Sequence, residues 1–333
     1  MSVKSIIAEI ESDVADVLAT QFSYTQTQNV PNANDPALSY ERGKLKSGKT
    51  LDTCVLYVDI RNSVAFNDVH QSITMGRLYT AFTKAILKAG RHHGGHTRNI
   101  IGDRIMIVFP QARCFTNAIE CAITINHIAE TILNKRFTTL DFKCGIGIDY
   151  GTLKVLKVGI QRNGTEGPEN KGLVWAGYPA NIASRLTDMA NKTVTEEYYE
   201  VLRNPINPAF LPYIPLAYNA FGVVPKPAAN PNEPFYLITT ETVEMTEAEF
   251  AKSFVPYDHT QDYFTSGGKM ITFKRKTRTT TYRPILITEA VYNGLVKEGL
   301  RLELAKSQDW QEQKQKIRNV DSKVYGATFT WKL

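Results

Sequence analysis

Two aspartates, each placed where an apolar run meets a polar turn, are the residues of this sequence best suited to carry chemistry. Asp59 follows the run Cys-Val-Leu-Tyr-Val, and Asp103 lies in Ile-Gly-Asp-Arg between two apolar runs. Either aspartate alone is more simply explained as a turn cap. As a pair at the tips of neighbouring strands they can share divalent cations, because Mg²⁺ and Mn²⁺ prefer oxygen ligands and bind carboxylates together with substrate phosphates.

Donors that suit a phosphate flank both aspartates. Backbone N–H groups of the turn after Asp59 can hold phosphate oxygens. The side chains of Arg61 and Arg104 either contact phosphate as well or balance the charge of the two carboxylates. The turn itself consists of Arg61, Asn62 and Ser63.

A second polar pair follows later in the chain. Asn181 and Arg185 are four residues apart, which puts both side chains on one face of a helix. A guanidinium offers a fork of donors to a phosphate, and an amide can orient a sugar. Because such pairs are common on helix surfaces, this one indicates a functional site only in combination with the two aspartates.

The hydropathy pattern predicts a mixed framework for these residues. Strand patterns cover 53–60 and 97–110, the latter as two short strands hinged at Gly102-Asp103, and 142–160 predicts a hairpin around Gly151. Helical spacing covers 70–92, 111–135 and 178–191, the last opened by Pro179. This order predicts an α+β fold with helices on one side of a mainly antiparallel sheet.

Four segments of different character divide the chain. Residues 1–50 form an amphipathic helix followed by a polar arm with little regular structure, and 51–203 form the first part of the core. Residues 204–283 are Pro-rich at first and then basic and β-prone, which predicts an insertion with its own small β structure. The core resumes over 284–333 with a strand, a helix and an edge-like final strand.

The composition is that of an ordinary globular protein. The 333 residues are 43% apolar and 22% charged, and the formal net charge of +6 suits a polyanionic ligand such as a nucleotide without demanding a nucleic acid. The basic run 274–278 is best explained as a solvated strand face, so no stable nucleic-acid partner is expected. Since no apolar stretch approaches the roughly 20 residues that span a bilayer, we expect a cytoplasmic protein with no membrane partner.

Taken together, the motifs resemble the catalytic domain of class III nucleotidyl cyclases. YVDIRNS, HHGGHTRNIIGD, GIGIDYG and NIASR occur in the order typical of that family, and the resemblance covers roughly 52–192 and 284–333. It implies a ferredoxin-like α+β fold that works as a head-to-tail homodimer. Metal ligands then come from one subunit and the Asn/Arg pair from the other, so that two active sites are shared.

The resemblance also implies a role for each matching residue. Asp59 and Asp103 match the metal-binding aspartates, and Ile60 lends a backbone carbonyl. Asn181 matches the residue that orients the ribose, and Arg185 the one that stabilises the pentavalent phosphorus. Two Mn²⁺ or Mg²⁺ ions per site would assist attack of the ribose 3′-hydroxyl on the α-phosphorus, with pyrophosphate leaving. A basic residue near the last hairpin grips the triphosphate in this family, and the candidates are Lys314, Lys316 and Arg318.

The two positions that read the base depart from the family pattern. Adenylate cyclases of this family carry a Lys and an Asp there, whereas this chain has Asn99 and Val174. Val174 cannot hydrogen-bond through its side chain, while Asn99 both donates and accepts and so matches the edge of uracil or of cytosine. Tyr57 and Trp175 would narrow the pocket, which favours a pyrimidine.

With these residues at the base-reading positions, the sequence resembles the bacterial pyrimidine cyclases of the Pycsar antiphage system. That likeness implies a uridylate cyclase whose cyclic UMP activates a separate effector, with UTP favoured over CTP. Other possibilities stay open: a cytidylate cyclase, an adenylate or guanylate cyclase with atypical base-reading residues, or a non-catalytic nucleotide-binding regulatory module. A polymerase-palm or diguanylate-cyclase-like enzyme is disfavoured because the sequence lacks the Gly-Gly-acidic-acidic turn.

Overall fold

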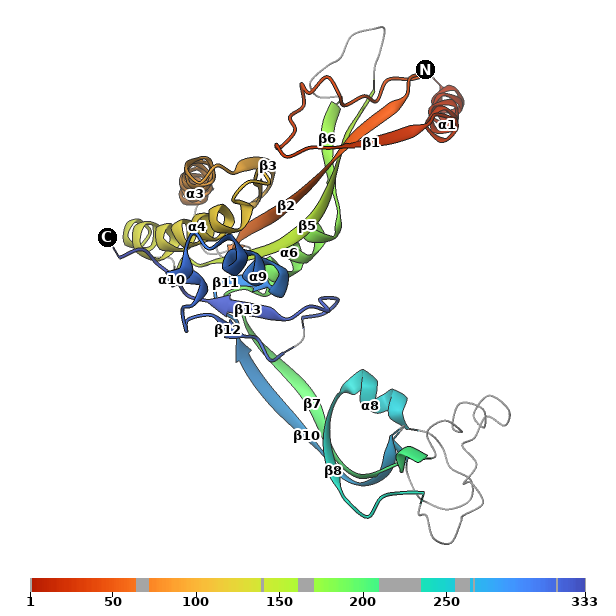
Figure 1. Ribbon diagram of the computed structural model, residues 1–333, viewed down its shortest axis with the longest axis vertical. Coiled ribbons are helices and arrows are strands. Elements are labelled where there is room, and N and C mark those ends of the chain that lie inside the picture. The colour runs from red at the N-terminus through yellow and green to blue at the C-terminus, as the bar shows by residue number, and fades with distance from the viewer. Residues whose placement is uncertain are drawn as a thin grey trace. The chain divides into compact units, whose positions relative to one another are not determined.

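The computed structural model of the chain describes residues 2–63, 72–138, 141–160, 171–209, 235–254, 264–265, 267–315 and 317–332. It divides into a core unit, residues 1–192 and 282–333, and a second unit, Thr193–Thr281 (Figure 1). The second unit begins before residue 204, where the insertion was expected to start, because its first strand, β7 (Thr193–Pro205), runs through that position.

A mixed sheet organises the core unit. In the described part of the chain it has nine strands in the order β12-β13-β11-β5-β2-β4-β3, with β1 added to β2 and β6 to β5. Among these described strands, the β1–β2 and β5–β11 pairings are parallel and the others are antiparallel. The strands are β1 (Phe22–Gln26), β2 (Lys46–Ile60), β3 (His96–Ile101), β4 (Arg104–Val108), β5 (Cys144–Gly159), β6 (Lys171–Ala176), β11 (Ile285–Thr288), β12 (Gln311–Glu312) and β13 (Val324–Ala327).

Helices cover both faces of this sheet. Even-numbered residues of β2, such as Leu56 and Val58, pack in one apolar cluster with side chains of α3 (Ser72–His92) and α4 (Cys114–His127). Odd-numbered residues such as Val55 pack in another cluster with α6 (Tyr178–Met189). The prediction that helices lie on one side was therefore wrong. Both faces of β2 are apolar, and both require a cover.

The remaining helices of the core unit follow the expected spacing. The helix expected over 111–135 is α4 continued by a π-helical segment, η1 (Ile128–Leu133), and a last turn, α5 (Asn134–Arg136). The chain begins with α1 (Val3–Ala19), and α9 (Glu289–Glu298) and α10 (Leu302–Ala305) follow β11. Among the helices of the described ranges, none combines the length and apolar character of a membrane-spanning segment.

Three local predictions need correction. The arm after α1 contains β1 and the first part of β2, which pair with each other in parallel. No hairpin forms at Gly151, because β5 pairs with β2 without interruption from Gly48↔Leu156 to Ile60↔Cys144. The final strand, β13, is not at the edge, since β12 pairs with its outer side.

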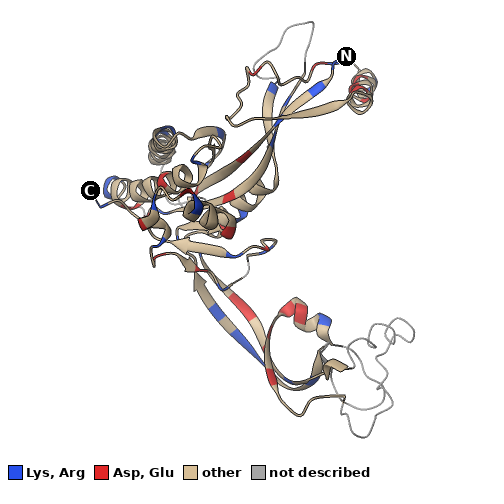
Figure 2. Cartoon of the chain, in the orientation of Figure 1, with Lys and Arg blue, Asp and Glu red and all other residues tan. Residues whose placement is uncertain are grey.

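In its described residues, the second unit consists of a four-stranded antiparallel sheet and one helix. Its strand order is β8-β7-β10-β9, where β8 is Glu241–Thr246, β9 is Phe264–Thr265 and β10 is Gly268–Thr281. The helix α8 (Glu247–Ser253) begins with a capping box at Thr246 and Glu249. Basic residues occur along β10 and acidic residues along β7 and β8 (Figure 2), and several of them form ion pairs across the strands. The ion pairs are Arg275–Glu197, Lys276–Glu200 and Arg278–Glu244, which agrees with a solvated strand face.

Candidate active site

The two aspartates of the candidate site lie at the same end of neighbouring strands. The pairing of β2 with β4 ends at Val58↔Ile105, so Asp59 and Arg104 are the next residues outward on the two strands. Asp103 occupies the tight turn between β3 and β4, where Gly102 has a φ of 61° that favours glycine. Asp59, as an odd-numbered residue of β2, points to the face that α6 covers.

The carboxylates of this pair fit a divalent cation. Oδ2 of Asp103 is buried and has no hydrogen-bond partner in the described part of the structure, and a buried carboxylate oxygen is costly unless a donor or a cation meets it. The described residues contain no cluster of three or more His, Cys, Asp or Glu side chains suited to a metal. A cation here would therefore depend on Asp59, Asp103, the Ile60 carbonyl and substrate oxygens, the mixture that Mg²⁺ and Mn²⁺ commonly use.

Arg104 connects the aspartate pair to α6. Its guanidinium donates to Asp59 Oδ2 at 2.8 Å and to Ser184 Oγ at 3.0 Å, and it also pairs with Asp188. Burial raises the pKa of Asp59, the hydrogen bond from Arg104 lowers it, and the nearby charge of Asp103 raises it again, so that the net pKa lies above the ordinary value. Ser184 and Asp188 could not be predicted as partners of Arg104, because their role depends on how α6 docks on the sheet.

Arg61 lies underneath α6. Its guanidinium donates to the carbonyl of Thr187 near the C-terminal end of that helix and covers Gly145 of β5. Asn62 is exposed in the left-handed conformation, with a φ of 58°, and Ser63 follows it. Residues 64–71 lie outside the described residues. The side chain of Arg61 thus bonds to α6 rather than pointing into open space, while the backbone of the turn directly follows Asp59.

Two glycines of β5 let α6 lie against the sheet. A Cβ on Gly147 would overlap the backbone of α6 at the Ala183 carbonyl and the Thr187 N–H. At Gly145 it would overlap Arg61 and the carbonyl of Ala190. The motif GIGIDYG therefore serves a close approach of helix and strand rather than a turn.

In the described structure, the polar pair on α6 does not bond to the aspartates of its own chain. Asn181 is exposed in the first helical turn, and Arg185 donates to the carbonyl of Asn319 at 2.6 Å. In the described part of the chain neither residue makes a hydrogen bond or ion pair with Asp59 or Asp103. The contact with Asn319 places exposed Arg318 close to Arg185. Lys314 is exposed, and Lys316 lies outside the described residues.

The candidate base-reading residues do not all share one face. Tyr57, Met106 and Asn99 are cross-strand neighbours on β2, β4 and β3, and the Tyr57 hydroxyl contacts Met106 Sδ at 3.3 Å. Trp175 of β6 packs with the cluster on this same face, beneath the Arg98 guanidinium at 5.6 Å. Val174, its neighbour along the strand, points to the opposite face. The structure therefore brings Trp175 to the side of Asn99 and Tyr57, and not Val174.

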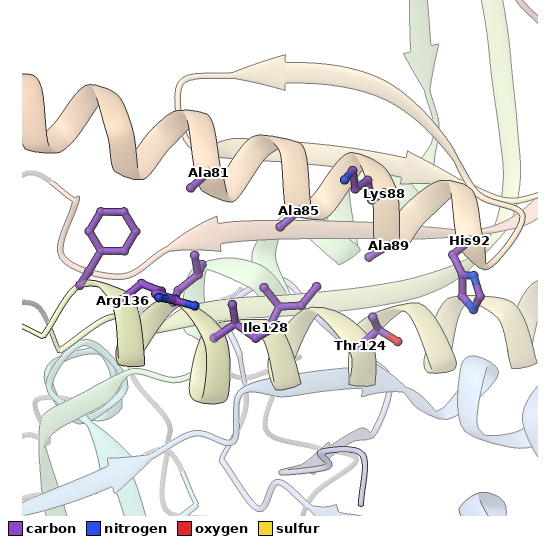
Figure 3. A pocket seen from close by; sticks show the side chains of 11 residues that line it. Ala81, Ala85, Lys88, Ala89, His92, Thr124, Ile128 and Arg136 are labelled. Carbon is purple, nitrogen blue, oxygen red and sulfur yellow. The ribbon is translucent and has the colours of Figure 1, made fainter. Parts of the chain in front are cut away.

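An apolar groove lies on the other side of the sheet. It has a volume of about 740 Å³ and runs between α3 and the helical segment formed by α4 and η1 (Figure 3). Small side chains such as Ala81, Ala85 and Ala89 line it, with Lys88 and Arg136 at its rim. No carboxylate is among its lining residues, so the aspartate pair remains the candidate active site.

The sheet, the aspartate pair and the Asn/Arg pair on α6 define a protein similar to class III nucleotidyl cyclases. No protein-family model matches the chain. A curated protein from Burkholderia cepacia named uridylate cyclase is 27% identical over 205 residues, which cover 60% of this chain and 85% of that protein. Another uridylate cyclase, from Xanthomonas perforans, is 28% identical over 202 residues, with 58% and 82% covered. These two matches confirm the resemblance drawn from the motifs.

Solved structures of cyclases are also similar to the chain. The adenylyl cyclase CyaB from P. aeruginosa aligns with 84% of this chain and 95% of that chain at 12% identity and a TM-score of 0.47. The guanylyl cyclase Cya2 aligns with 42% of this chain and 71% of that chain at 18% identity and a TM-score of 0.38.

Proposed function

We propose that this protein is a nucleotidyl cyclase that converts UTP into 3′,5′-cyclic UMP and pyrophosphate. The observation that carries the proposal is the match to three curated uridylate cyclases, which extends over 85%, 82% and 75% of their lengths. The buried, unpartnered Oδ2 of Asp103 beside Asp59 adds physical support, because it provides the oxygen ligands that the reaction requires.

In the proposed reaction, the protein mainly positions the triphosphate. Asp59, Asp103 and the Ile60 carbonyl would hold two Mn²⁺ or Mg²⁺ ions, which when bound assist deprotonation of the 3′-hydroxyl and neutralise the leaving pyrophosphate. Asn181 orients the ribose, and Arg185 donates to the oxygens of the α-phosphate as they gain charge. Arg318, which lies near Arg185, is the described residue best placed to bind the triphosphate tail.

We infer that the active sites form between two copies of the chain. In the described residues, Asn181 and Arg185 make no hydrogen bond or ion pair with the aspartates of their own chain, which agrees with a site completed by an Asn/Arg pair from another copy. A head-to-tail pair with twofold symmetry supplies it twice, because each copy then lends its aspartates to one site and its α6 to the other.

Base selection is proposed to rest on the face that carries Tyr57, Asn99 and Trp175. Asn99 can donate to O4 of uracil and accept from its N3–H, which suits UTP. The same amide can turn over to meet cytosine, so a cytidylate cyclase is the second candidate. The bulk of Trp175 narrows the space for a purine.

The activity is tested by product identification. Pure protein is incubated with each of the four nucleoside triphosphates and Mn²⁺, and the products are identified by mass spectrometry. We expect cyclic UMP to dominate, and we expect the double substitution Asp59→Ala with Asp103→Ala to abolish turnover while circular dichroism stays unchanged. Cyclic AMP as the main product would end the pyrimidine proposal, and turnover by the double variant would end the metal assignment.

We further propose that the cyclic nucleotide is an alarm signal in antiphage defence and acts on a separate effector. The support is the similarity to bacterial pyrimidine cyclases. Cells that carry the gene together with a separate effector that responds to cyclic UMP should resist phage infection, and the double aspartate variant should remove the resistance. Equal protection by wild type and variant would contradict a signalling role for the product.

A further inference from the structure

Arg104 binds the Asp59 carboxylate, which a catalytic cation would also bind. Its guanidinium donates to Asp59 Oδ2 at 2.8 Å from β4, and the same nitrogen pairs with Asp188 of α6. A second nitrogen donates to Ser184 Oγ at 3.0 Å. One cationic side chain thus neutralises the buried aspartate of the proposed metal site and is also held by two groups on α6.

We propose that Arg104 is a built-in counter-ion that competes with the divalent cation for Asp59, and that Asp188 and Ser184 hold the guanidinium when the cation binds. This inference rests on the proposed function, since it concerns the same metal site. It assigns Asp188 and Ser184 a task in the enzyme and makes Arg104 a positioning residue rather than a phosphate ligand.

The difference in exposure between the two carboxylates supports this arrangement. The Asp59 side chain is 16% exposed and that of Asp188 is 53% exposed. A largely buried carboxylate is unfavourable without a partner, and Arg104 supplies one before a metal arrives. Asp188 already pairs with Arg104 and is better solvated, so it can remain the partner of the guanidinium when a cation takes the guanidinium's place at Asp59.

The charges determine the direction of the exchange. A divalent cation at Asp59 repels a guanidinium a few ångströms away, and the low exposure of Asp59 weakens the screening by water. Because one nitrogen of Arg104 already donates to both carboxylates, its bond to Asp188 can persist while its bond to Asp59 breaks. The side chain needs only a rotation, and no backbone movement of β4 or α6 is required.

The proposal is tested by Mn²⁺ affinity, measured by electron paramagnetic resonance of free Mn²⁺ in titrations without nucleotide. Arg104→Met should tighten Mn²⁺ binding by about tenfold, because it removes a competing unit charge. Asp188→Asn should weaken binding by about threefold, because Arg104 then stays on Asp59. Lys88→Met, which removes the same formal charge from α3 on the other side of the sheet, is the matched control and should leave the affinity unchanged.

The variant that combines Arg104→Met with Asp188→Asn separates this exchange from a simple effect of charge. If Asp188 acts through Arg104, the effect of Asp188→Asn should shrink in the Arg104→Met background. An equal effect in both backgrounds, or weaker Mn²⁺ binding by Arg104→Met, would overturn the proposal. Asp188 lies on an exposed part of α6, so its substitution gives an independent result even if Arg104→Met does not fold. An unchanged affinity of Asp188→Asn would also overturn it.

A failure of the metal site itself gives a different result. Asp59→Asn should lose Mn²⁺ binding if Asp59 is a ligand. If the wild-type protein, Arg104→Met and Asp59→Asn all bind Mn²⁺ equally, the proposed metal assignment fails and the counter-ion role fails with it. If only Asp59→Asn loses binding while Arg104→Met matches the wild type, the counter-ion role fails alone.

Discussion

A buried carboxyl outside the candidate site offers a test at the scale of single residues. Asp149 of β5 accepts a hydrogen bond from the Thr288 hydroxyl at 2.6 Å, and its other oxygen is buried with no hydrogen-bond partner in the described structure. Burial raises the pKa of Asp149, although the hydrogen bonds from Thr288 and from the Tyr150 backbone oppose the rise. The folded protein therefore holds this proton more firmly than the unfolded chain does.

The sign of the resulting pH dependence follows from linkage. A carboxyl whose folded pKa is raised stabilises the fold fully at pH values below its unfolded pKa, and the contribution is lost as the pH rises through the folded value. We expect Asp149→Asn, which cannot titrate, to gain stability relative to wild type as the pH rises from the ordinary carboxyl pKa of 3.8 toward neutrality. Thermal unfolding at several pH values in that range measures the difference. A difference that is constant or falls with pH would show that the Asp149 pKa is not raised.

The sequence predicts some of these residue-level features and misses others for a physical reason. Alternation along β2 already assigns Asp59 to the face of Val55 and Tyr57, so its direction was predictable. The partners of Arg104 were not, since Ser184 and Asp188 reach it only after α6 docks across the sheet. Likewise, Val174 and Trp175 could not be assigned to faces before the register between β5 and β6 was known.

At the scale of elements, the packing of α6 on β5 positions both halves of the candidate site. The helix carries Asn181 and Arg185 and also the partners of Arg104, and it approaches β5 closely at Gly147. A small shift of α6 would move all of these side chains together. The close approach is therefore a requirement of the site as well as of the core.

We predict that Gly147→Ala is destabilising. The added Cβ would overlap the backbone of α6, which cannot give way as a flexible side chain can, so we expect a loss of about 1–3 kcal/mol in the free energy of unfolding. Gly172→Ala in β6 is the control, because a Cβ there meets nothing within 4 Å. Chemical denaturation measures both variants. Equal stability of the two would contradict the close packing of α6 on β5.

Element boundaries show where a one-dimensional pattern is ambiguous. The helices α3, α4 and α6 follow their periodicity closely, whereas the hairpin expected at Gly151 is one long strand. Alternating residues on both sides of a glycine are typical of a hairpin and also of a continuous strand, and only the pairing with β2 decides between them. β1 was missed because four of its five residues are exposed, so its sequence shows no alternation of buried and exposed positions, and because its pairing partner, Lys46–Thr50, follows only about twenty residues later.

At the scale of the whole molecule, α1 presents an apolar face that the described core does not cover. Its polar side is anchored, since Asp16 accepts from Lys46 at 3.1 Å and from the Gly43 N–H at 2.8 Å. The apolar positions recur every three or four residues, the spacing of a coiled-coil seam. Val3, Ile7, Ile10, Val14 and Val17 are each more than half exposed.

We expect this face of α1 to stabilise the proposed dimer. Removal of residues 1–20, or the single change Ile10→Asp in the seam, should shift dissociation to higher protein concentration. The control is Ala15→Asp, which adds the same charge outside the seam. Light scattering over a dilution series gives the molecular mass. A dimer that is unaffected by the truncation would refute this role.

The central claim is that one chain supplies the aspartates and another the Asn/Arg pair of each active site, and complementation between two inactive variants tests it most directly. Asp59→Asn and Arg185→Ala are purified separately, mixed in equal amounts and assayed for cyclic UMP by mass spectrometry. Half of the randomly mixed dimers contain both variants, and each of these has one intact site, so about a quarter of wild-type activity should return. If the mixture remains as inactive as its components, the two halves of the site do not come from different chains.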